Sequence, residues 1–243
     1  MAFWLSPLPD NVKTRFAIPA GYQQLKVAPG SFEEWLQNLP LKPAGTHTLT
    51  YRGDIARTDV YTAAVADVSV GKQDLQQCAD AVMRLRGEYL YHQKRYNEIS
   101  FNFVSGFKCD YVHYADGYRY SGNHWKLTAK KDYSYNTFLK YMELVFAYAG
   151  TLSLEKQLKP VSAPDQLKAG DIFIHGGSPG HCFIVMEVVE NSAHKRQFLL
   201  AQSFMPAQNI QVLQYDGSPW FSMDKSSDIA YGNLINPQYL RSF

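Results

Sequence analysis

The clearest hydrophobic pattern in the chain is helical and covers residues 75–96. Apolar side chains recur there at intervals of three and four, which puts them on one face of a helix: Leu75, Cys78, Val82, Leu85 and Tyr89. Asp74, followed three residues later by Gln77, supplies a start signal. The pattern therefore predicts a long packed helix that begins just after Asp74.

The last third of the chain has a strand pattern. Four apolar runs are separated by short turn-rich pieces, at 170–176, 181–190, 196–204 and 209–215. Further strands are expected at 47–53, 59–70 and 98–106, and further helices directly after Ser31 and at 135–149. Residues 1–30, rich in proline and aromatic residues, are expected to wrap around the rest. We therefore expect one α+β domain over residues 1–243, with a helical and mixed part (31–150) and an antiparallel barrel or meander (170–215) packed against helices.

Composition excludes several classes of protein. A chain of 243 residues that is 46% hydrophobic can build its own core. It has no apolar run of eighteen residues, so we expect no transmembrane segment. A net charge of +2 gives no strong field for nucleic acid, and three cysteines are too few for a disulfide framework. The oligomeric state stays open.

Motifs for nucleotide or zinc binding are absent, so we expect no cofactor and no metal. His175 and His181 bracket a Gly/Pro turn, but no acidic or cysteine pattern completes a metal site. The turn matches the G-x-S-x-G pattern of a serine nucleophile. Because Pro179 has no N–H for an oxyanion hole and the turn joins two strands, we interpret Ser178 only as a candidate binding residue.

One candidate set of catalytic residues remains. Cysteine hydrolases need a cysteine near a helix N-terminus, a histidine on an adjoining strand and a polar residue that orients the imidazole. Cys78 lies near the start of its predicted helix, and His181 opens a strand. If that strand forms a hairpin with the next one around residues 191–194, Gln202 or Ser203 would lie within reach of His181. Gln77 or backbone N–H groups would then receive the oxyanion.

Core packing is the alternative role for Cys78. It shares a stripe with apolar residues, and free cysteine is among the most buried residue types. With Asp74 as the cap, the thiol would also lie about one turn too deep for a strong helix-dipole effect. Cys182, next to His181 on the same strand, is expected to point away from it into the core.

Two further groups of residues are candidates for binding. Asp80, Arg84 and Glu88 follow one another at helical spacing, which is typical of a solvated ladder of ion pairs. Alternatively, Arg84 or Arg86 could clamp a carboxylate. The stretch 107–126 is rich in aromatic and charged residues and could stack a sugar or a peptide through Tyr114 and Trp125, or simply fill a core.

Several long phrases resemble one family. They are LPLKPAGT (39–46), DLQQCADAVMRLRGEYLY (74–91), FNFVSGF (101–107), GDIFIHGGSPGHCFIVMEV (170–188), LLAQSFMPAQNIQVL (199–213) and SPWF (218–221). Together they resemble the domain-of-unknown-function family 4846. This resemblance implies a bacterial protein of the Bacteroidetes type, often made with an export or lipoprotein signal. MAFWLSPLPDNVKTRF (1–16) shows no such signal, so a cell-envelope location and a cytoplasmic one both remain open.

More distantly, the C-terminal third is similar to the NlpC family of papain-like cell-wall peptidases. That resemblance implies a barrel opened by Gly170-Asp171, with His181 as base, Gln202 as orienting residue and Cys78 as nucleophile. The usual Asp-Cys-Ser-Gly context around the cysteine is missing here. We therefore expect either a cysteine amidase or peptidase acting on cell-wall peptides, or a non-catalytic envelope protein that binds a glycan or peptide on a papain-like scaffold.

Overall fold

A computed structural model describes residues 10–243 of the chain. In this part of the chain the α-helices are α1 (Val12–Arg15), α2 (Phe32–Gln37), α3 (Cys78–His92), α4 (Tyr111–Ala115), α5 (Tyr135–Tyr148) and α6 (Thr151–Gln157). The strands are β1 (Tyr22–Gln24), β2 (Thr62–Val65), β3 (Ser100–Asn102), β4 (Lys108–Asp110), β5 (Tyr118–Ser121), β6 (His124–Leu127), β7 (Lys159–Pro160), β8 (Ile172–His175), β9 (His181–Asn191), β10 (Arg196–Gln202), β11 (Gln211–Leu213), β12 (Trp220–Phe221) and β13 (Leu240–Ser242). The predicted mixture of helices and antiparallel strands is confirmed.

One large antiparallel sheet organises the described chain. Its strand order is β2-β11-β10-β9-β8-β13-β7, with β1 added along β9 and β12 added along β10. The sheet is open within residues 10–243, because its end strands β2 and β7 do not pair with each other. The expectation of a closed barrel is therefore wrong for the described chain, whereas the antiparallel arrangement is right.

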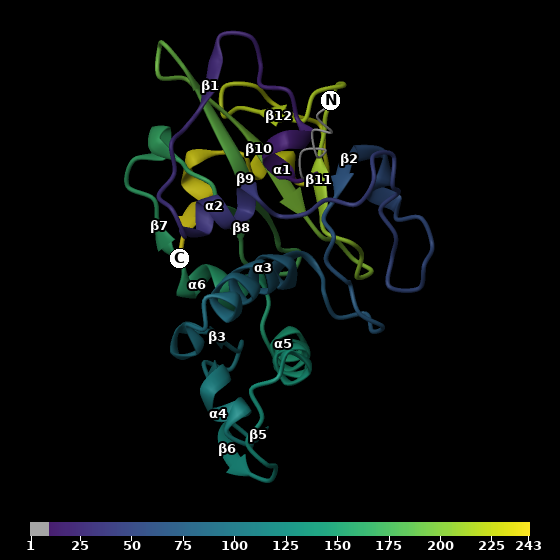
Figure 1. The fold of residues 1–243 in the computed structure, drawn as a ribbon, viewed down its shortest axis with the longest axis vertical. Helices are drawn as coiled ribbons and strands as arrows, with labels where there is room; N and C mark the ends of the chain where they lie inside the picture. Colours follow the sequence, from purple (N-terminus) through teal and green to yellow (C-terminus); the bar gives the residue numbers. More distant parts are fainter. Residues whose placement is uncertain (1–9) are drawn as a thin grey trace, which may run out of the picture.

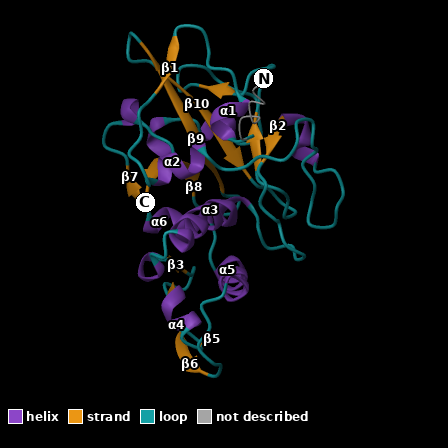
Figure 2. Cartoon of the chain, in the orientation of Figure 1, coloured by secondary structure: helices purple, strands orange, loops and turns teal. Residues whose placement is uncertain are grey.

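Helices α3, α4 and α5 and the small hairpins lie beyond one end of this sheet, whereas α1 and α2 lie against it (Figure 1). In Figure 1 the sheet occupies the upper half, α3 crosses the middle, and α4, α5 and the β5–β6 hairpin form the lower end. Figure 2 shows that the lower end is mostly helix and loop, whereas the long strands lie above α3. Helix α3 is thus the element between the two parts, and its two ends face different surroundings.

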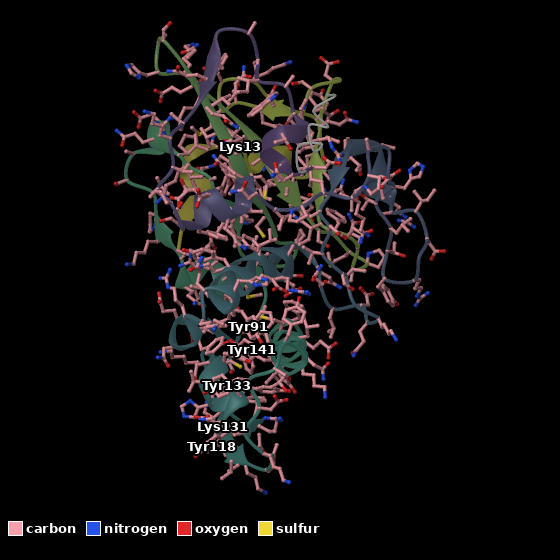
Figure 3. The ribbon with its side chains drawn as sticks, in the orientation of Figure 1. Lys13, Tyr91, Tyr118, Lys131, Tyr133 and Tyr141 are labelled. Carbon is pink, nitrogen blue, oxygen red and sulfur yellow. The ribbon has the colours of Figure 1, made fainter. Side chains whose placement is uncertain are left out.

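Aromatic packing holds the lower end together. Figure 3 shows Tyr91, Tyr141 and Tyr133 in this region, with Tyr118 closer to the tip. Tyr91 packs against Phe138 of α5 with ring centroids 4.6 Å apart. Tyr141 is fully buried, and its hydroxyl donates a hydrogen bond to the Cys109 carbonyl at 2.8 Å. Most of the aromatic residues in this part therefore serve its core.

Some predicted elements differ in extent. The two long helices are shorter than expected, Cys78–His92 instead of 75–96 and Tyr135–Tyr148 instead of 135–149. Residues 47–53 form only isolated bridges, at Leu49 and Thr50. Residues 59–70 hold the end of a 3-10 helix before β2. Short polar segments such as these show strand-like alternation without a partner long enough to continue the ladder.

The described part of the N-terminal segment lies against the sheet and against α2. Residues 1–9 of the expected wrapping segment 1–30 lie outside the described residues. In the remainder, α1 packs on α2 and β9, and β1 pairs with the far end of β9, with Tyr22 opposite Asn191. This segment therefore covers part of the sheet at a distance from the start of α3.

Candidate functional site

Cys78 is the first residue of α3. The predicted start at Asp74 is wrong, because the Asp74 carboxylate instead accepts hydrogen bonds from the Ala207 N–H (2.6 Å) and the Gln77 side-chain amide (3.2 Å). Gln77 has an extended backbone and is the N-cap, and its N–H donates to the Asp80 carboxylate at 3.0 Å. The thiol is therefore in the first helical turn, where unpaired N–H groups and the helix dipole favour a negative charge.

Three neighbours stabilise the thiolate form of Cys78. Its pKa is lowered to about 5, first by an interaction with the thiol of Cys182 and then by hydrogen bonding and charge interaction with His181. The Ala79 N–H adds a smaller contribution from the helix start, and burial opposes all of these effects. A thiolate that is present at neutral pH is the nucleophilic form of cysteine.

His181 is oriented by a side-chain amide, as the hairpin geometry requires. Its Nε2 lies 2.7 Å from the side-chain oxygen of Gln202. Since an amide oxygen only accepts hydrogen bonds, Nε2 carries the proton, and Nδ1 is the nitrogen left to exchange a proton with Cys78. The two strands join through a turn at residues 192–195, close to the position predicted from the sequence.

Aromatic rings enclose this imidazole. Tyr231 stacks on His181 with centroids 4.6 Å apart and planes 20° apart, and Phe183 and Phe204 approach within 4.8 and 5.2 Å. Only 2% of His181 is exposed, so water reaches its ring poorly. Tyr231 has a φ of 63°, a left-handed conformation that side-chain-bearing residues adopt at a cost. Sequence reasoning missed Tyr231, because nothing in its local sequence marks it as a neighbour of a residue on β9.

The Gly/Pro turn before His181 forms a wall of the site. A side chain at Gly180 would bring its Cβ within 2.3 Å of the Thr151 hydroxyl, and one at Gly176 would lie 2.7 Å from the Glu155 carboxylate. Glycine at these positions therefore allows the turn to pack directly on α6. Ser178 is exposed on the rim, so the turn supplies shape instead of a nucleophile.

A pocket of about 400 Å³ opens over Cys78. Its walls are the first turn of α3, the end of α5 with the start of α6, and the turn at residues 177–180. Asp80 lines it as well, is 6% exposed, and has one carboxylate oxygen without a hydrogen-bond partner among residues 10–243. Burial raises the pKa of Asp80 well above its ordinary value, and the neighbouring thiolate raises it further.

Two more hollows lie along α3 beyond this pocket. A small one shares Leu75 and Phe146 with the Cys78 pocket, and it shares Ser69, Arg84 and Leu139 with a larger one of about 370 Å³. The larger hollow is lined by aromatic and charged side chains, among them Trp35, Asp67, Glu88, His92 and Tyr135. We call the three hollows together the α3 groove.

Arg84 lines the α3 groove but is not a free clamp. Its Nε donates to Glu88 at 2.7 Å, and both side chains are at most 7% exposed. One of its terminal nitrogens donates to the Gln76 side-chain oxygen at 3.1 Å. The expected solvated ladder is therefore wrong: Asp80, Arg84 and Glu88 are all buried, because the loop before α3 and helix α5 cover this face.

The remaining candidate residues lie elsewhere or have structural partners. Arg86 sits among the rings of Phe32, Tyr89 and Phe243 on another face of α3. The Ser203 hydroxyl contacts the carbonyls of Gln76 (3.0 Å) and Gln208 (2.9 Å), which ties the segment before α3 to the end of β10.

Tyr114 and Trp125 belong to the lower end of the molecule and do not line the α3 groove. Tyr114 is buried beneath the Arg119 guanidinium, 4.1 Å from its ring centroid. Trp125 stacks on His113 with centroids 5.6 Å apart. The structure thus brings together Cys78, His181 and Gln202, with Gln77 beside them, and separates them from Arg86, Tyr114 and Trp125.

Residues 10–243 offer neither a metal-binding cluster nor a membrane-spanning helix. No cluster of three or more His, Cys, Asp or Glu side chains in this range is arranged to hold a metal ion. No helix in the same range has the length and apolar character needed to cross a membrane.

Comparison with known proteins gives a family and no activity. The model of a family described as a domain of unknown function (4846) matches residues 12–239. The chain belongs to this family. No curated protein and no solved structure matches the chain. The family match covers every element of the site, including Cys78 and Tyr231, so the geometry above is the geometry of a member of the 4846 family.

Proposed function

We propose that the protein is a cysteine hydrolase, an amidase or peptidase that acts on cell-wall peptides. The observation that carries this proposal is the trio of Cys78, His181 and Gln202, of which Cys78 lines a pocket and the other two are buried behind it. A thiol at a helix start, an imidazole beside it and an amide oxygen 2.7 Å from the far ring nitrogen are the parts that nucleophilic catalysis by cysteine requires.

The steps of the reaction follow from this arrangement. The Cys78 thiolate attacks the carbonyl carbon of an amide, and the oxygen takes up the negative charge. The first turn of α3 lines the same pocket, and its N–H groups would stabilise that oxygen. The Gln77 side chain is less suited to this role, since it already donates to Asp74. His181 Nδ1 protonates the departing amine, and water then releases the acyl group from Cys78.

The α3 groove supports a peptide as the substrate. Helix α3 has 15 residues and is therefore about 22 Å long, so the groove along it offers room for several extended residues. The hollow at its far end combines the rings of Trp35 and Tyr135 with the carboxylate of Asp67. A distant relationship to NlpC-type papain-like peptidases, an origin in Bacteroidetes and a cell-envelope location, as in a lipoprotein, are parts of the same proposal. They are supported by sequence resemblance alone.

Alkylation tests the site without knowledge of the substrate. We expect iodoacetamide to label Cys78 of the native protein with a pH midpoint near 5, against about 8.5 for an ordinary cysteine. Gln202→Leu should raise this midpoint, because His181 loses its orienting partner, and should slow release of peptides from purified peptidoglycan. Cys78→Ala is the control without a nucleophile, and Cys109→Ala should behave as the unmodified protein. Labelling of Cys78 only after denaturation would overturn the proposal.

A second candidate function is a non-catalytic binding protein for a glycan or peptide. The hollow around Trp35 and Tyr135 favours it, because that hollow contains none of the residues of the thiol chemistry. This alternative predicts that Cys78→Ala binds soluble peptidoglycan fragments as tightly as the unmodified protein and that the unmodified protein releases no product. Trp35→Ala should then weaken binding. If binding also required Tyr114 or Trp125, the ligand would instead sit at the lower end of the molecule.

A further inference from the structure

A second sulfur lies beside the thiol of Cys78. The thiols of Cys78 and Cys182 interact, and this interaction is the largest influence on both of their pKa values. The hydrolysis described above does not use Cys182. It is fully buried, whereas Cys78 is partly exposed in a pocket open to solvent. Cys182 belongs to the buried core cluster against which Cys78 packs, and α3 contacts β9. The Cys78 sulfur is therefore accessible to small reagents from the pocket, whereas the Cys182 sulfur is enclosed.

We propose that Cys78 and Cys182 form a peroxide-reactive pair, in which a hydroperoxide oxidises Cys78 and Cys182 then captures the oxidised sulfur in an intramolecular disulfide. The pair needs no large backbone movement, because Cys78 and Cys182 pack in the same core cluster and their thiols interact. Helix α3 contacts β9, and its first residue interacts with both His181 and Cys182 at the start of that strand.

The first step consumes one hydroperoxide. The Cys78 thiolate attacks the outer peroxide oxygen, a sulfur–oxygen bond forms, and the oxygen–oxygen bond breaks. The proton that Cys78 gave up to His181 passes to the departing oxygen, so the products are a sulfenic acid on Cys78 and an alcohol, or water when the oxidant is hydrogen peroxide. The sulfur is oxidised by two electrons, and the peroxide is reduced by two.

The second step needs no further oxidant. The Cys182 sulfur attacks the sulfenic sulfur, a sulfur–sulfur bond forms, and the hydroxyl leaves with the Cys182 proton as water. Before oxidation, the Cys78 thiolate is one of the causes that raise the pKa of Cys182. Oxidation removes that charge, so it makes Cys182 easier to deprotonate at the moment when its attack is required.

This chemistry is selective for one pair among three cysteines. Burial raises the pKa of Cys109, which is fully buried on β4 and has no cysteine neighbour in the interactions that set it. If the proposed hydrolase function holds, the disulfide also removes the nucleophile, and activity returns only when a thiol reductant opens the bond.

Peptide mapping of the intact protein tests the pair. We expect hydrogen peroxide to give a product lighter by two hydrogens, with a Cys78–Cys182 cross-linked peptide that dithiothreitol removes. In Cys182→Ala the Cys78 sulfenic acid has no neighbouring thiol with which to form a disulfide. Dimedone should therefore trap about ten times more of it than in the unmodified protein. Cys109→Ala should form the cross-link normally and is the matched control.

Two outcomes would overturn the proposal. One is that peroxide leaves Cys78 reduced, and the other is that Cys78 of the unmodified protein passes to sulfinic acid without the cross-linked peptide. Cross-linking in the unmodified protein decides the matter even if Cys182→Ala folds poorly. Because the readout is a mass and not hydrolysis, a protein that forms the cross-link but cleaves no peptide when fully reduced would refute the hydrolase proposal and leave this one standing.

Discussion

Helix α3 carries two buried polar clusters: in one, a carboxylate oxygen lacks a partner, and in the other, the charged groups are paired. At its first turn, Cys78 and Asp80 line a pocket, Cys78 interacts with His181, and one Asp80 oxygen has no hydrogen-bond partner within residues 10–243. Farther along, Arg84 and Glu88 pair at 2.7 Å, and the Tyr135 hydroxyl donates to the same Glu88 oxygen, also at 2.7 Å. A buried ion pair is costly to break because one charge is left alone, whereas buried ionisable groups that lack partners are typical of sites that carry out chemistry.

Breaking the second cluster should have the largest effect on stability. Arg84→Ala leaves Glu88 buried without its cation, so we expect a loss of about 3–5 kcal/mol in the free energy of unfolding, measured with urea. The double variant Arg84→Met/Glu88→Leu should recover most of that loss, because no buried charge remains. The folded fraction of Arg84→Ala should alkylate Cys78 at the unmodified rate. A loss below about 1 kcal/mol would mean that the pair is hydrated and that the contrast with the first cluster is false.

Changing the first cluster should have a smaller effect that depends on pH. The pKa of Asp80 is raised by burial, so the folded state keeps a proton that the unfolded chain releases near pH 4. The contribution of Asp80 is therefore most favourable below about pH 4 and is lost as the pH rises through the folded pKa. Asp80→Asn cannot ionise and should lose less stability between about pH 5 and about pH 8, with a gain on the order of 1–3 kcal/mol at the upper end.

Urea unfolding at several pH values checks this expectation for Asp80. The control is Asp54→Asn, which removes an exposed carboxylate. It should leave the pH dependence of the free energy of unfolding unchanged. An Asp80→Asn profile that runs parallel to that of the unmodified protein would show that Asp80 ionises normally in the folded state.

The smallest expected effect is at Tyr135. Tyr135→Phe keeps the ring and deletes the hydroxyl that donates to Glu88, so we expect a loss of about 1 kcal/mol in the free energy of unfolding. Because the deleted bond belongs to the second cluster, the rate of Cys78 alkylation at about pH 6 should not change. A slower alkylation rate would mean that the two clusters are coupled along α3.

Periodicity could predict which elements exist and which face of α3 is apolar, and the turn between β9 and β10 followed from two adjacent apolar runs. That turn also brought Gln202 within reach of His181. The helix start could not be read from Asp74, because the carboxylate is occupied by Ala207, a residue distant in sequence. The spacing of Arg84 and Glu88 predicted their ion pair. The pair is buried because α5, which is distant in sequence, packs against α3.

Other parts of the site left no trace in the sequence. Alternation along β9 correctly predicted that Cys182 is buried, but it gave no sign that its thiol would interact with the first residue of a distant helix. Tyr231 reaches His181 from a loop without regular secondary structure, through a left-handed backbone that no local pattern indicates. Contacts between residues far apart in sequence are set by the packing of whole elements, and hydrophobic periodicity does not encode them.

The lowered pKa of Cys78 has a practical use in measuring how the chain acquires its native state. His181 and Cys182 meet this sulfur only once β9 has docked against α3, so an unfolded chain presents three thiols of ordinary reactivity. A brief pulse of alkylating agent at mildly acidic pH would mark only the molecules that have completed this docking. The Cys78 thiol is thus an intrinsic reporter of refolding kinetics that requires neither an attached dye nor a substrate.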